Sequence, residues 1–305
     1  MLHRKKVQDV NFIFQKKTKG EQALHIVMIV ILSAWCLTFL FPLLWLLIQS
    51  LFDRNSYAID LILYGKFSLP KVWHFENYLD AFSVLEVETG GTKTNFFGML
   101  FNSLWFIAIG ETWCLLWPVM VGYIFSKYRF PGRSSLYAVI IFAITVPVIG
   151  ASGAYYKLID FFNLYDTGPL FVIITGLGGF ESSMLIYYGI FKGISWSYAE
   201  SVFIDGGGHT RAFFSVMLPQ AMPAISAMMV TSLISLWNQY EQFIMYLPSF
   251  PTVATGLYYV SLSTNDTPQV LYYSGLIISI VPVLIIYALM AEKMMKNLSI
   301  GGLKG

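Results

Sequence analysis

The chain has 305 residues, of which 56% belong to the set AVILMFWYC and 12% are charged, and its net charge at pH 7 is +2. A soluble globular protein carries roughly 25% charged residues, so this chain has too few charges to cover a soluble surface, and its apolar excess must face lipid. The small net charge argues against nucleic-acid binding, and Cys36 and Cys114 lie in apolar runs without the spacing of a disulfide or zinc site.

Long apolar intervals of low charge recur along the chain. A helix needs about 20 largely apolar residues to cross a bilayer. The pattern predicts an all-α integral membrane protein with six transmembrane helices in one membrane domain, residues 21–296, between tails at 1–20 and 297–305. The predicted spans are about 22–52, 95–126, 135–156, 169–191, 223–247 and 270–291. The first span is not a cleavable signal peptide, because its apolar core is too long and a long basic stretch precedes it.

The positions of Lys and Arg predict the orientation, since positive charges near span ends are retained in the cytoplasm. With six spans, both tails and the segments after the second and fourth spans share one side, which holds fourteen of the nineteen Lys and Arg residues. We therefore expect both termini in the cytoplasm. Segment 53–93 is then external, whereas segment 192–222 is cytoplasmic and longer than a helical hairpin requires.

Segment 192–222 carries a glycine run, Gly206–Gly208, between apolar residues at helical spacing. These apolar residues are Val202, Phe203, Ala212, Phe213, Val216 and Met217. The pattern predicts a short helix, a turn and a second helix lying against a partner surface. The run lacks the Gly-Lys-Ser/Thr of a phosphate-binding loop, which favours a hinge. The alternative, a helix adsorbed on lipid headgroups, is disfavoured because Lys192 and Arg211 are balanced by Glu200 and Asp205.

The same segment resembles the signature of the permease subunits of binding-protein-dependent ATP-binding-cassette importers, in particular the maltose-type carbohydrate importers. That signature is Glu-Ala-Ala, a later Gly, and then Ile-x-Leu-Pro. This chain has Glu200, Gly206, Val216, Leu218 and Pro219 at the same spacing, and Asp205 corresponds to the Asp of the carbohydrate branch of the family. It departs at Ser201 and Val202, which replace the two alanines, and at Val216, which replaces Ile. The likeness covers about residues 20–305 and includes Leu69–Pro70, Phe75–Tyr78, Asn102–Ser103, Lys127–Gly132, Trp237–Asn238 and Gly301–Gly305.

The resemblance implies a permease subunit that is not an enzyme and binds no cofactor itself. Its implied partners are a second homologous permease, two cytoplasmic ATPase subunits that bind ATP and Mg, an external solute-binding protein and a carbohydrate substrate, in the inner membrane of a bacterial cell. In the family, a coupling helix in the loop docks in a groove of the ATPase. The implied ATPase-coupling residues are Glu200, Ser201, Val202, Asp205, Gly206, Gly207, His209, Arg211, Leu218 and Pro219.

The remaining segments have implied roles of their own. The external segments 53–93 and 249–269 are candidates for docking the binding protein. The C-terminal tail, residues 297–305, is a candidate for reaching the ATPase interface.

Polar and aromatic residues within the predicted spans are candidates for the translocation pathway. A carboxylate inside a span is costly and usually faces a cavity, a partner or a proton path, and a carboxylate satisfied near a helix end is the alternative. Aromatic rings suit sugars, although Trp and Tyr also gather at membrane interfaces. The pathway candidates are Glu111, Glu181, Tyr187, Tyr188, Trp237, Asn238 and Tyr240.

Two other functional classes remain open. An ion- or proton-coupled secondary transporter would explain the spans and the buried Glu111 and Glu181, but it would leave segment 192–222 unexplained. An intramembrane enzyme would need a nucleophile with a base, or metal ligands. The sequence has no His-Glu-x-x-His or Gly-x-Ser-x-Gly motif, and no metal site is expected.

Overall fold

The computed structural model describes residues 19–65, 69–146, 150–176, 182–263 and 268–301. This part of the chain is mostly helical. Its longer helices are α1 (Lys19–Gln49), α4 (Phe96–Lys127), α5 (Arg133–Thr145), α6 (Ala151–Phe161), α8 (Ser183–Gly193), α11 (Leu218–Trp237), α13 (Val253–Leu262) and α14 (Gln269–Gly301). The shorter elements are α2 (Tyr57–Tyr64), α3 (Asn77–Val84), α7 (Pro169–Gly176), α9 (Ser197–Ile204), α10 (His209–Ala212), the π-helix η1 (Phe213–Met217) and α12 (Glu241–Tyr246).

The strands β1 (Glu86–Thr89) and β2 (Thr92–Asn95) form an antiparallel hairpin between α3 and α4. Glu86 pairs with Asn95 and Thr89 with Thr92, so the two turn residues are Gly90 and Gly91. Both glycines have positive φ. A two-residue hairpin turn of this kind needs positive φ at both positions, which explains the Gly-Gly pair.

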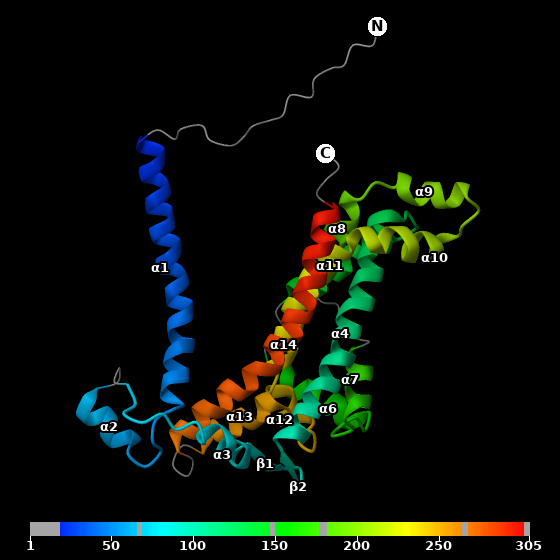
Figure 1. The fold of residues 1–305 in the computed structure, drawn as a ribbon. Coiled ribbons are helices and arrows are strands. Elements are labelled where there is room, and N and C mark those ends of the chain that lie inside the picture. The colour runs from blue at the N-terminus through cyan, green and yellow to red at the C-terminus, as the bar shows by residue number, and fades with distance from the viewer. Residues whose placement is uncertain (1–18, 66–68, 147–149, 177–181, 264–267, 302–305) are drawn as a thin grey trace.

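The long helices run between two ends of the molecule (Figure 1). One end, here called the α9 end, carries α9 and α10 together with the start of α1 and the end of α14. The other end, called the hairpin end, carries α2, α3, the β-hairpin, α12 and α13. The start of α1, segment 192–222 and the end of α14 therefore lie on one side, as the distribution of Lys and Arg predicts. That this side faces the cytoplasm remains a prediction.

Within the described residues, the helices long and apolar enough to cross a membrane are Lys19–Gln49, Phe96–Lys127, His209–Trp237 and Gln269–Leu289. The first, α1, stands apart from the other helices except near its last turns (Figure 1), and its side chains are exposed from Lys19 to Leu44. A row of exposed Leu, Ile, Val and Phe of this length is stable only outside water. The chain is therefore a multi-pass membrane protein.

The predicted span 135–156 is divided in the structure. Helix α5 ends at Thr145 and α6 begins at Ala151. The sequence places Pro147 just after α5, and a proline disfavours helical backbone at the residue before it.

The predicted span 169–191 contains two described helices. Helix α7 ends at Gly176 and α8 begins at Ser183, while Glu181, a predicted pathway residue, lies outside the described residues. Neither predicted span is among the described helices that are long enough to cross a membrane, so the count of six crossings remains a prediction.

The fifth span differs from its predicted bounds, 223–247, at both ends. The helix runs from His209 to Trp237, so the second half of the predicted loop 192–222 belongs to it. Between α10 and α11 it widens into η1, where the backbone N–H of Leu218 donates to the carbonyl of Phe213. The next residue, Pro219, has no N–H to continue the ladder, which favours such an irregular turn there.

The core lies where α4 packs against α7, α8 and α11. Gly122 allows α4 to approach the backbone of α8, since a Cβ at this position would lie 2.8 Å from the backbone nitrogen of Tyr188. Small residues commonly permit such close packing of membrane helices. Helix α4 is thus the element that connects the two ends and contacts most of the bundle.

Candidate functional site

The α9–α10 segment, residues 197–212, projects from the bundle at one end (Figure 1). Gly206 closes its turn with φ of +78°, a conformation that costs any residue with a Cβ. The backbone N–H of Gly206 donates to the carbonyl of Phe203 at 3.0 Å, and that of Gly207 donates to Val202 at 2.8 Å. A Cβ on Gly207 would lie 2.6 Å from a methyl carbon of Val202. The predicted helix, turn and second helix are therefore present, and two of the glycines are required by the turn.

The inner face of this segment is buried against the bundle. Ala199, Ala212 and Phe213 pack in one apolar cluster with Tyr123 of α4 and Phe191 of α8. The ring centroid of Tyr123 lies 4.7 Å from that of Phe213 and 5.2 Å from that of Phe191. The segment is therefore fixed to two core helices as well as continuous with α11.

Four aromatic rings hold the segment at the end of α4. Tyr128, directly after α4, hydrogen-bonds through its hydroxyl to Nδ1 of His209 at 3.0 Å, and its ring centroid lies 5.7 Å from that of Trp196. The rings of Phe203 and His209 are 4.9 Å apart. The ammonium group of Lys127 donates to the carbonyl of Ile194. Sequence reasoning assigned no role to Lys127, Tyr128 or Trp196, because each interacts with a partner that is distant in the chain.

The outer face of the segment is open. Ile204 is 85% exposed and Tyr198 is 49% exposed. The predicted coupling residues on or near this face that are exposed are Glu200, Ser201, Asp205, Gly206, His209, Arg211 and Pro219, whereas Val202, Gly207 and Leu218 are half-buried. Most of these residues therefore lie on the projecting α9–α10 segment, where the exposed Ile204 stands beside the acidic Glu200 and Asp205, whereas Leu218 and Pro219 lie at the start of α11.

A second candidate site is a cavity of about 330 Å³ between α4, α8, α11 and α12. It is lined by Phe106, Cys114, Ser183, Tyr187, Met228, Thr231, Ser232, Ser235, Leu236, Gln239 and Gln242. A neighbouring cavity of about 240 Å³ shares Phe106, Cys114, Leu236 and Gln242 with it and extends toward Trp113, Tyr155 and Thr175. We refer to the first as the α11 cavity.

Glu111 lies behind the wall of the α11 cavity. The hydroxyl of Ser232 donates to Oε1 of Glu111 at 2.7 Å and so links α11 to α4. Oε2 of Glu111 is buried and has no hydrogen-bond partner within the described residues. Tyr187 lines the cavity and is itself 2% exposed.

The other predicted pathway residues lie elsewhere. Tyr188 packs against Tyr137, Trp237 is buried among other side chains near Val253, and the ring of Tyr240 stacks on that of Tyr258. Asn238 is exposed and its amide donates to the carbonyl of Ile234.

Several residues of the α11 cavity were missed by sequence reasoning. Thr231, Ser235 and Gln239 recur at intervals of four residues, which places them on one face of a helix. This spacing was a signal present in the sequence. Ser183 and Gln242 carry no such signal, because helix packing alone brings α8 and α12 to the same cavity.

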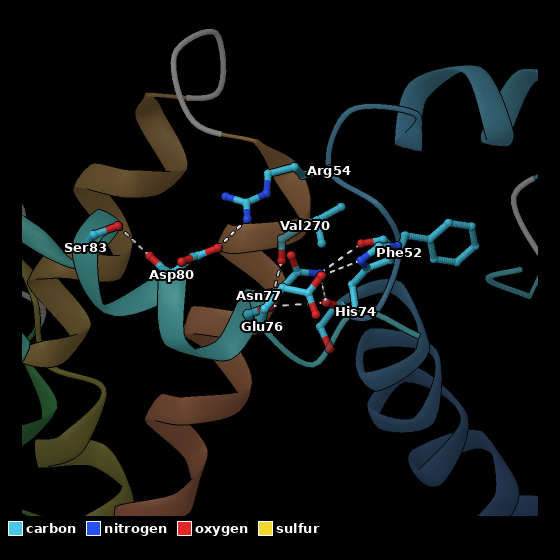
Figure 2. A network of polar contacts seen from close by, with 10 residues as sticks. Phe52, Arg54, His74, Glu76, Asn77, Asp80, Ser83 and Val270 are labelled. Carbon is cyan, nitrogen blue, oxygen red and sulfur yellow. Dashed lines mark hydrogen bonds and ion pairs between the residues drawn. The ribbon is translucent and has the colours of Figure 1, made fainter. Parts of the chain in front are cut away.

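At the hairpin end, the side chain of Asn77 connects α3 to the end of α1 (Figure 2). Its amide donates to the carbonyls of Ser50 at 3.0 Å and Phe52 at 2.9 Å, and the residue is 1% exposed. The hydroxyl of Ser274, on α14, donates to the same carbonyl of Ser50 at 3.3 Å. One buried amide therefore fixes the chain that leaves α1 beside α3 and α14.

Charged groups cover this junction (Figure 2). Arg54 forms an ion pair with Asp80, and Nδ1 of His74 lies 2.6 Å from Oε1 of Glu76. The hydrogen bond with His74 holds the pKa of Glu76 below its ordinary value. This surface belongs to segment 53–93, which was predicted to dock a binding protein.

The second such segment, 249–269, meets the first through the hairpin. The hydroxyl of Thr89 donates to the carbonyl of Pro248, just before this segment, at 2.7 Å, and the hydroxyl of Ser249 lies 3.4 Å from the carbonyl of Gly90. The carboxylate of Asp166, which has φ of +56°, accepts from the backbone N–H of Ser249 at 3.0 Å and from its hydroxyl at 2.6 Å. Three segments distant in sequence therefore form one surface at the hairpin end.

Metal chemistry finds no support in this part of the chain. Among the residues that the structure describes, no group of three or more His, Cys, Asp or Glu side chains is placed to hold a metal ion.

Comparisons with known proteins all match this chain to membrane components of transport systems. Residues 116–296 match the family described as "Binding-protein-dependent transport system inner membrane component". The chain is 27% identical over 279 residues to the diacetylchitobiose uptake system permease protein NgcG of Streptomyces coelicolor. The aligned region covers 89% of this chain and 86% of that protein. It is 27% identical over 273 residues to the arabinooligosaccharides transport system permease protein AraQ of Bacillus subtilis, with 88% and 92% covered.

A solved structure has the same fold. It is a crystal structure of a bacterial ABC transporter involved in the import of the acidic polysaccharide alginate, which aligns with a TM-score of 0.70 and 19% identity over 90% of this chain and 98% of the other.

Proposed function

Because this chain belongs to the family of binding-protein-dependent transport system inner membrane components, we propose that it is the permease subunit of an ATP-driven carbohydrate importer that receives force through its α9–α10 segment. The family resemblance found in the sequence is confirmed, and the chain is a permease subunit of an ABC importer. The proposal adds that a cytoplasmic ATPase binds the outer face of the α9–α10 segment. It also adds that a second permease completes the translocation pathway and that an external solute-binding protein delivers a sugar to the hairpin end.

The observation that carries this proposal is the contrast between the two faces of the α9–α10 segment. Ala199, Ala212 and Phe213 on the inner face are buried against α4 and α8, whereas Ile204 on the outer face is 85% exposed. An exposed, isolated apolar side chain is ordinary on a soluble surface, but here it sits at the tip of a rigid projection. The segment is built to hold its own shape while it presents a contact surface.

Force on such a surface would reach the core helices directly. The segment continues into α11 without a break in the helix, and the ring of Phe213, the next residue after the segment, packs against Tyr123 of α4 and Phe191 of α8. Packed interiors shift as units because they have few voids to absorb a displacement. A movement of the segment is therefore expected to move α4, α8 and α11 together, and these three helices surround the α11 cavity.

The carbohydrate part of the proposal is supported by the named relatives, which are permeases for diacetylchitobiose and arabinooligosaccharides. The comparisons do not favour the secondary transporter weighed from Glu111 and Glu181. ATP and Mg would bind the partner ATPase, so this chain is proposed to catalyse no reaction of its own.

A pair of matched variants tests the ATPase contact. Ile204→Glu places a charge at the tip of the α9–α10 segment, and Ile62→Glu places the same charge on α2, at the hairpin end, where the side chain is 83% exposed. Neither change alters a buried contact. We expect the Ile204 variant to lose the copurifying ATPase and ATP-dependent sugar uptake in reconstituted vesicles, while the Ile62 variant keeps the ATPase. Retention of the ATPase by both variants, or sugar flux in the absence of ATPase subunits, would refute the proposal.

A further inference from the structure

The start of α5 borders a second kind of cavity, which is basic. It has a volume of about 550 Å³ and is called the α5 cavity here. Its polar lining consists of Arg129, Arg133, Ser134, Ser135, Tyr137 and Tyr188, and no Asp or Glu belongs to the lining. Neither arginine forms an ion pair within the described part of the chain. Two positive charges that share a cavity without a carboxylate favour an anionic ligand.

The hydrogen-bond donors of the α5 cavity suit an anion with several oxygens. Nε of Arg133 donates to the carbonyl of Phe125 at 2.9 Å, and Nη2 donates to the same oxygen, so this guanidinium is fixed against the last turn of α4. Its other N–H groups remain available to a ligand. Arg129 is exposed, and Ser134 and Ser135 add exposed hydroxyl groups in the first turn of α5. A phosphate accepts several charge-assisted hydrogen bonds at once and therefore matches this set.

The α5 cavity lies at the α9 end, where the long helices reach the surface of the membrane. The hydroxyl of Tyr128, in the loop before α5, bonds to His209 of the α9–α10 segment at 3.0 Å. The ring centroids of Tyr137 and Tyr188 are 5.3 Å apart, and the ammonium of Lys192 lies 5.7 Å from the ring centroid of Tyr188. Tyrosine and basic side chains gather at the depth of the lipid headgroups. The α5 cavity is therefore at the depth of the headgroups in the leaflet on this side.

An apolar ridge leads from the α5 cavity along the same helix. Leu136, Val139 and Phe142 are 50%, 61% and 69% exposed, and residues three apart form one ridge on a helix surface. Helix α5 packs back along α4, with Ile140 and Phe125 in one cluster, so the ridge extends from the headgroups toward the acyl chains. A soluble anion, or an acidic side chain of a cytoplasmic partner, would fill the cavity and leave this ridge bare. A lipid covers both.

We propose that the α5 cavity binds the phosphate of an anionic phospholipid, with Arg129 and Arg133 on the phosphate and the acyl chains along the ridge. Basic pockets between membrane helices commonly hold anionic headgroups. A zwitterionic phospholipid carries the same phosphate, but its ammonium group would lie near the two guanidinium groups and be repelled. The bound lipid joins the ends of α4, α5 and α8. The proposal concerns no residue of the ATPase contact and does not depend on the proposed function.

Hydrogen exchange in nanodiscs tests the site locally. The assembled transporter is placed in nanodiscs of phosphatidylcholine that contain an increasing fraction of phosphatidylglycerol with the same acyl chains, and exchange is followed in residues 128–137. We expect phosphatidylglycerol to slow this exchange by about tenfold at ten times its Kd, because the lipid binds the closed form of the loop. Inorganic phosphate added to nanodiscs of phosphatidylcholine alone should have no such effect, since it gains nothing from the ridge.

Matched variants assign the effect to the arginines. Arg129→Gln removes one charge and no hydrogen bond of the described fold, and it should need at least about tenfold more phosphatidylglycerol for the same slowing. Arg129→Lys keeps the charge without the planar fork and should fall between Gln and wild type. Lys157→Gln makes the same change of charge at an exposed position on α6 and should respond as wild type does.

Four results would overturn the proposal. The first is exchange in residues 128–137 that does not respond to phosphatidylglycerol, and the second is an equal response to inorganic phosphate, which would make the cavity a site for a free anion. The third is an unchanged lipid dependence in Arg129→Gln. The fourth is loss of the copurifying ATPase from Arg129→Gln with no change in lipid dependence, which would assign the arginine to an acidic partner protein.

Discussion

Gly206 offers a sharp test of whether the shape of the α9–α10 turn matters. Its φ of +78° lies in the left-handed region, and a Cβ added there meets no atom within 4 Å, so Gly206→Ala changes backbone strain and not packing. Left-handed backbone costs a residue with a Cβ roughly 1–2 kcal/mol. That energy would lower the ratio of closed to open turn by about five- to thirtyfold. Gly208→Ala is the matched control, because Gly208 has φ of −90° and a Cβ there also meets open space.

Hydrogen exchange of residues 201–212 in the purified complex measures the turn directly. The amides of Gly206 and Gly207 should exchange faster in the Gly206 variant by the same five- to thirtyfold factor, because their hydrogen bonds to Phe203 and Val202 open with the turn. The copurifying ATPase should decrease in parallel. Gly206→Asn should fall between wild type and Ala, since Asn tolerates left-handed backbone better. If the variants at Gly206 and Gly208 behave alike, backbone strain at Gly206 does not govern the segment.

Further predictions concern the hairpin end. Asn77→Ala removes two buried hydrogen bonds to the carbonyls that follow α1 and should lower the free energy of unfolding by about 1–3 kcal/mol, measured by thermal unfolding in detergent, whereas Ser83→Ala on the exposed side of α3 should have almost no effect. The lowered pKa of Glu76 means that its stabilising contribution is present above the ordinary carboxyl pKa, about 4.3, and is lost as the pH falls through the lowered value. The melting temperatures of wild type and Glu76→Gln should therefore differ at neutral pH and converge in acid, and a constant difference would contradict this reasoning. Asp166→Ala removes the two hydrogen bonds that Ser249 donates to the carboxylate, so hydrogen exchange in residues 247–251 should become faster, by at least about tenfold for each lost hydrogen bond to a charged group. Unchanged exchange there would show that other contacts hold the loop.

The α9–α10 segment shows which structural features the local sequence is able to predict. The glycine run, the apolar residues around it and the signature residues Glu200 to Pro219 predicted a helix, a turn and a second helix, and all three are present. These features depend on backbone preference and short-range periodicity, which neighbouring residues fix by themselves. The loop bounds were less accurate, because the chain from His209 onward is already helix and joins α11 through a π-helical turn.

For the membrane spans, too, some features were predicted from the sequence and others were not. The extents of α1, α4 and α14 follow from uninterrupted apolar composition, since length and hydropathy alone decide whether a helix suits a bilayer. The break after Thr145 was not predicted, although Pro147 is visible in the sequence. Composition averaged over a whole interval conceals where its helix stops.

Sequence alone determined that this protein lies in a membrane, that one long segment holds a helix, a turn and a second helix, and that the chain resembles ABC importer permeases, because composition and short spacings are properties of the chain itself. Only the tertiary structure decided which polar groups share a cavity. Cys114, Tyr187, Ser235 and Gln242 come from four different helices, and the rotation of each helix about its axis is set by close packing, such as that at Gly122. That rotation depends on contacts between residues far apart in sequence, so only the folded chain shows that Thr231, Ser235 and Gln239 line one cavity while Trp237 and Tyr240 lie outside its lining.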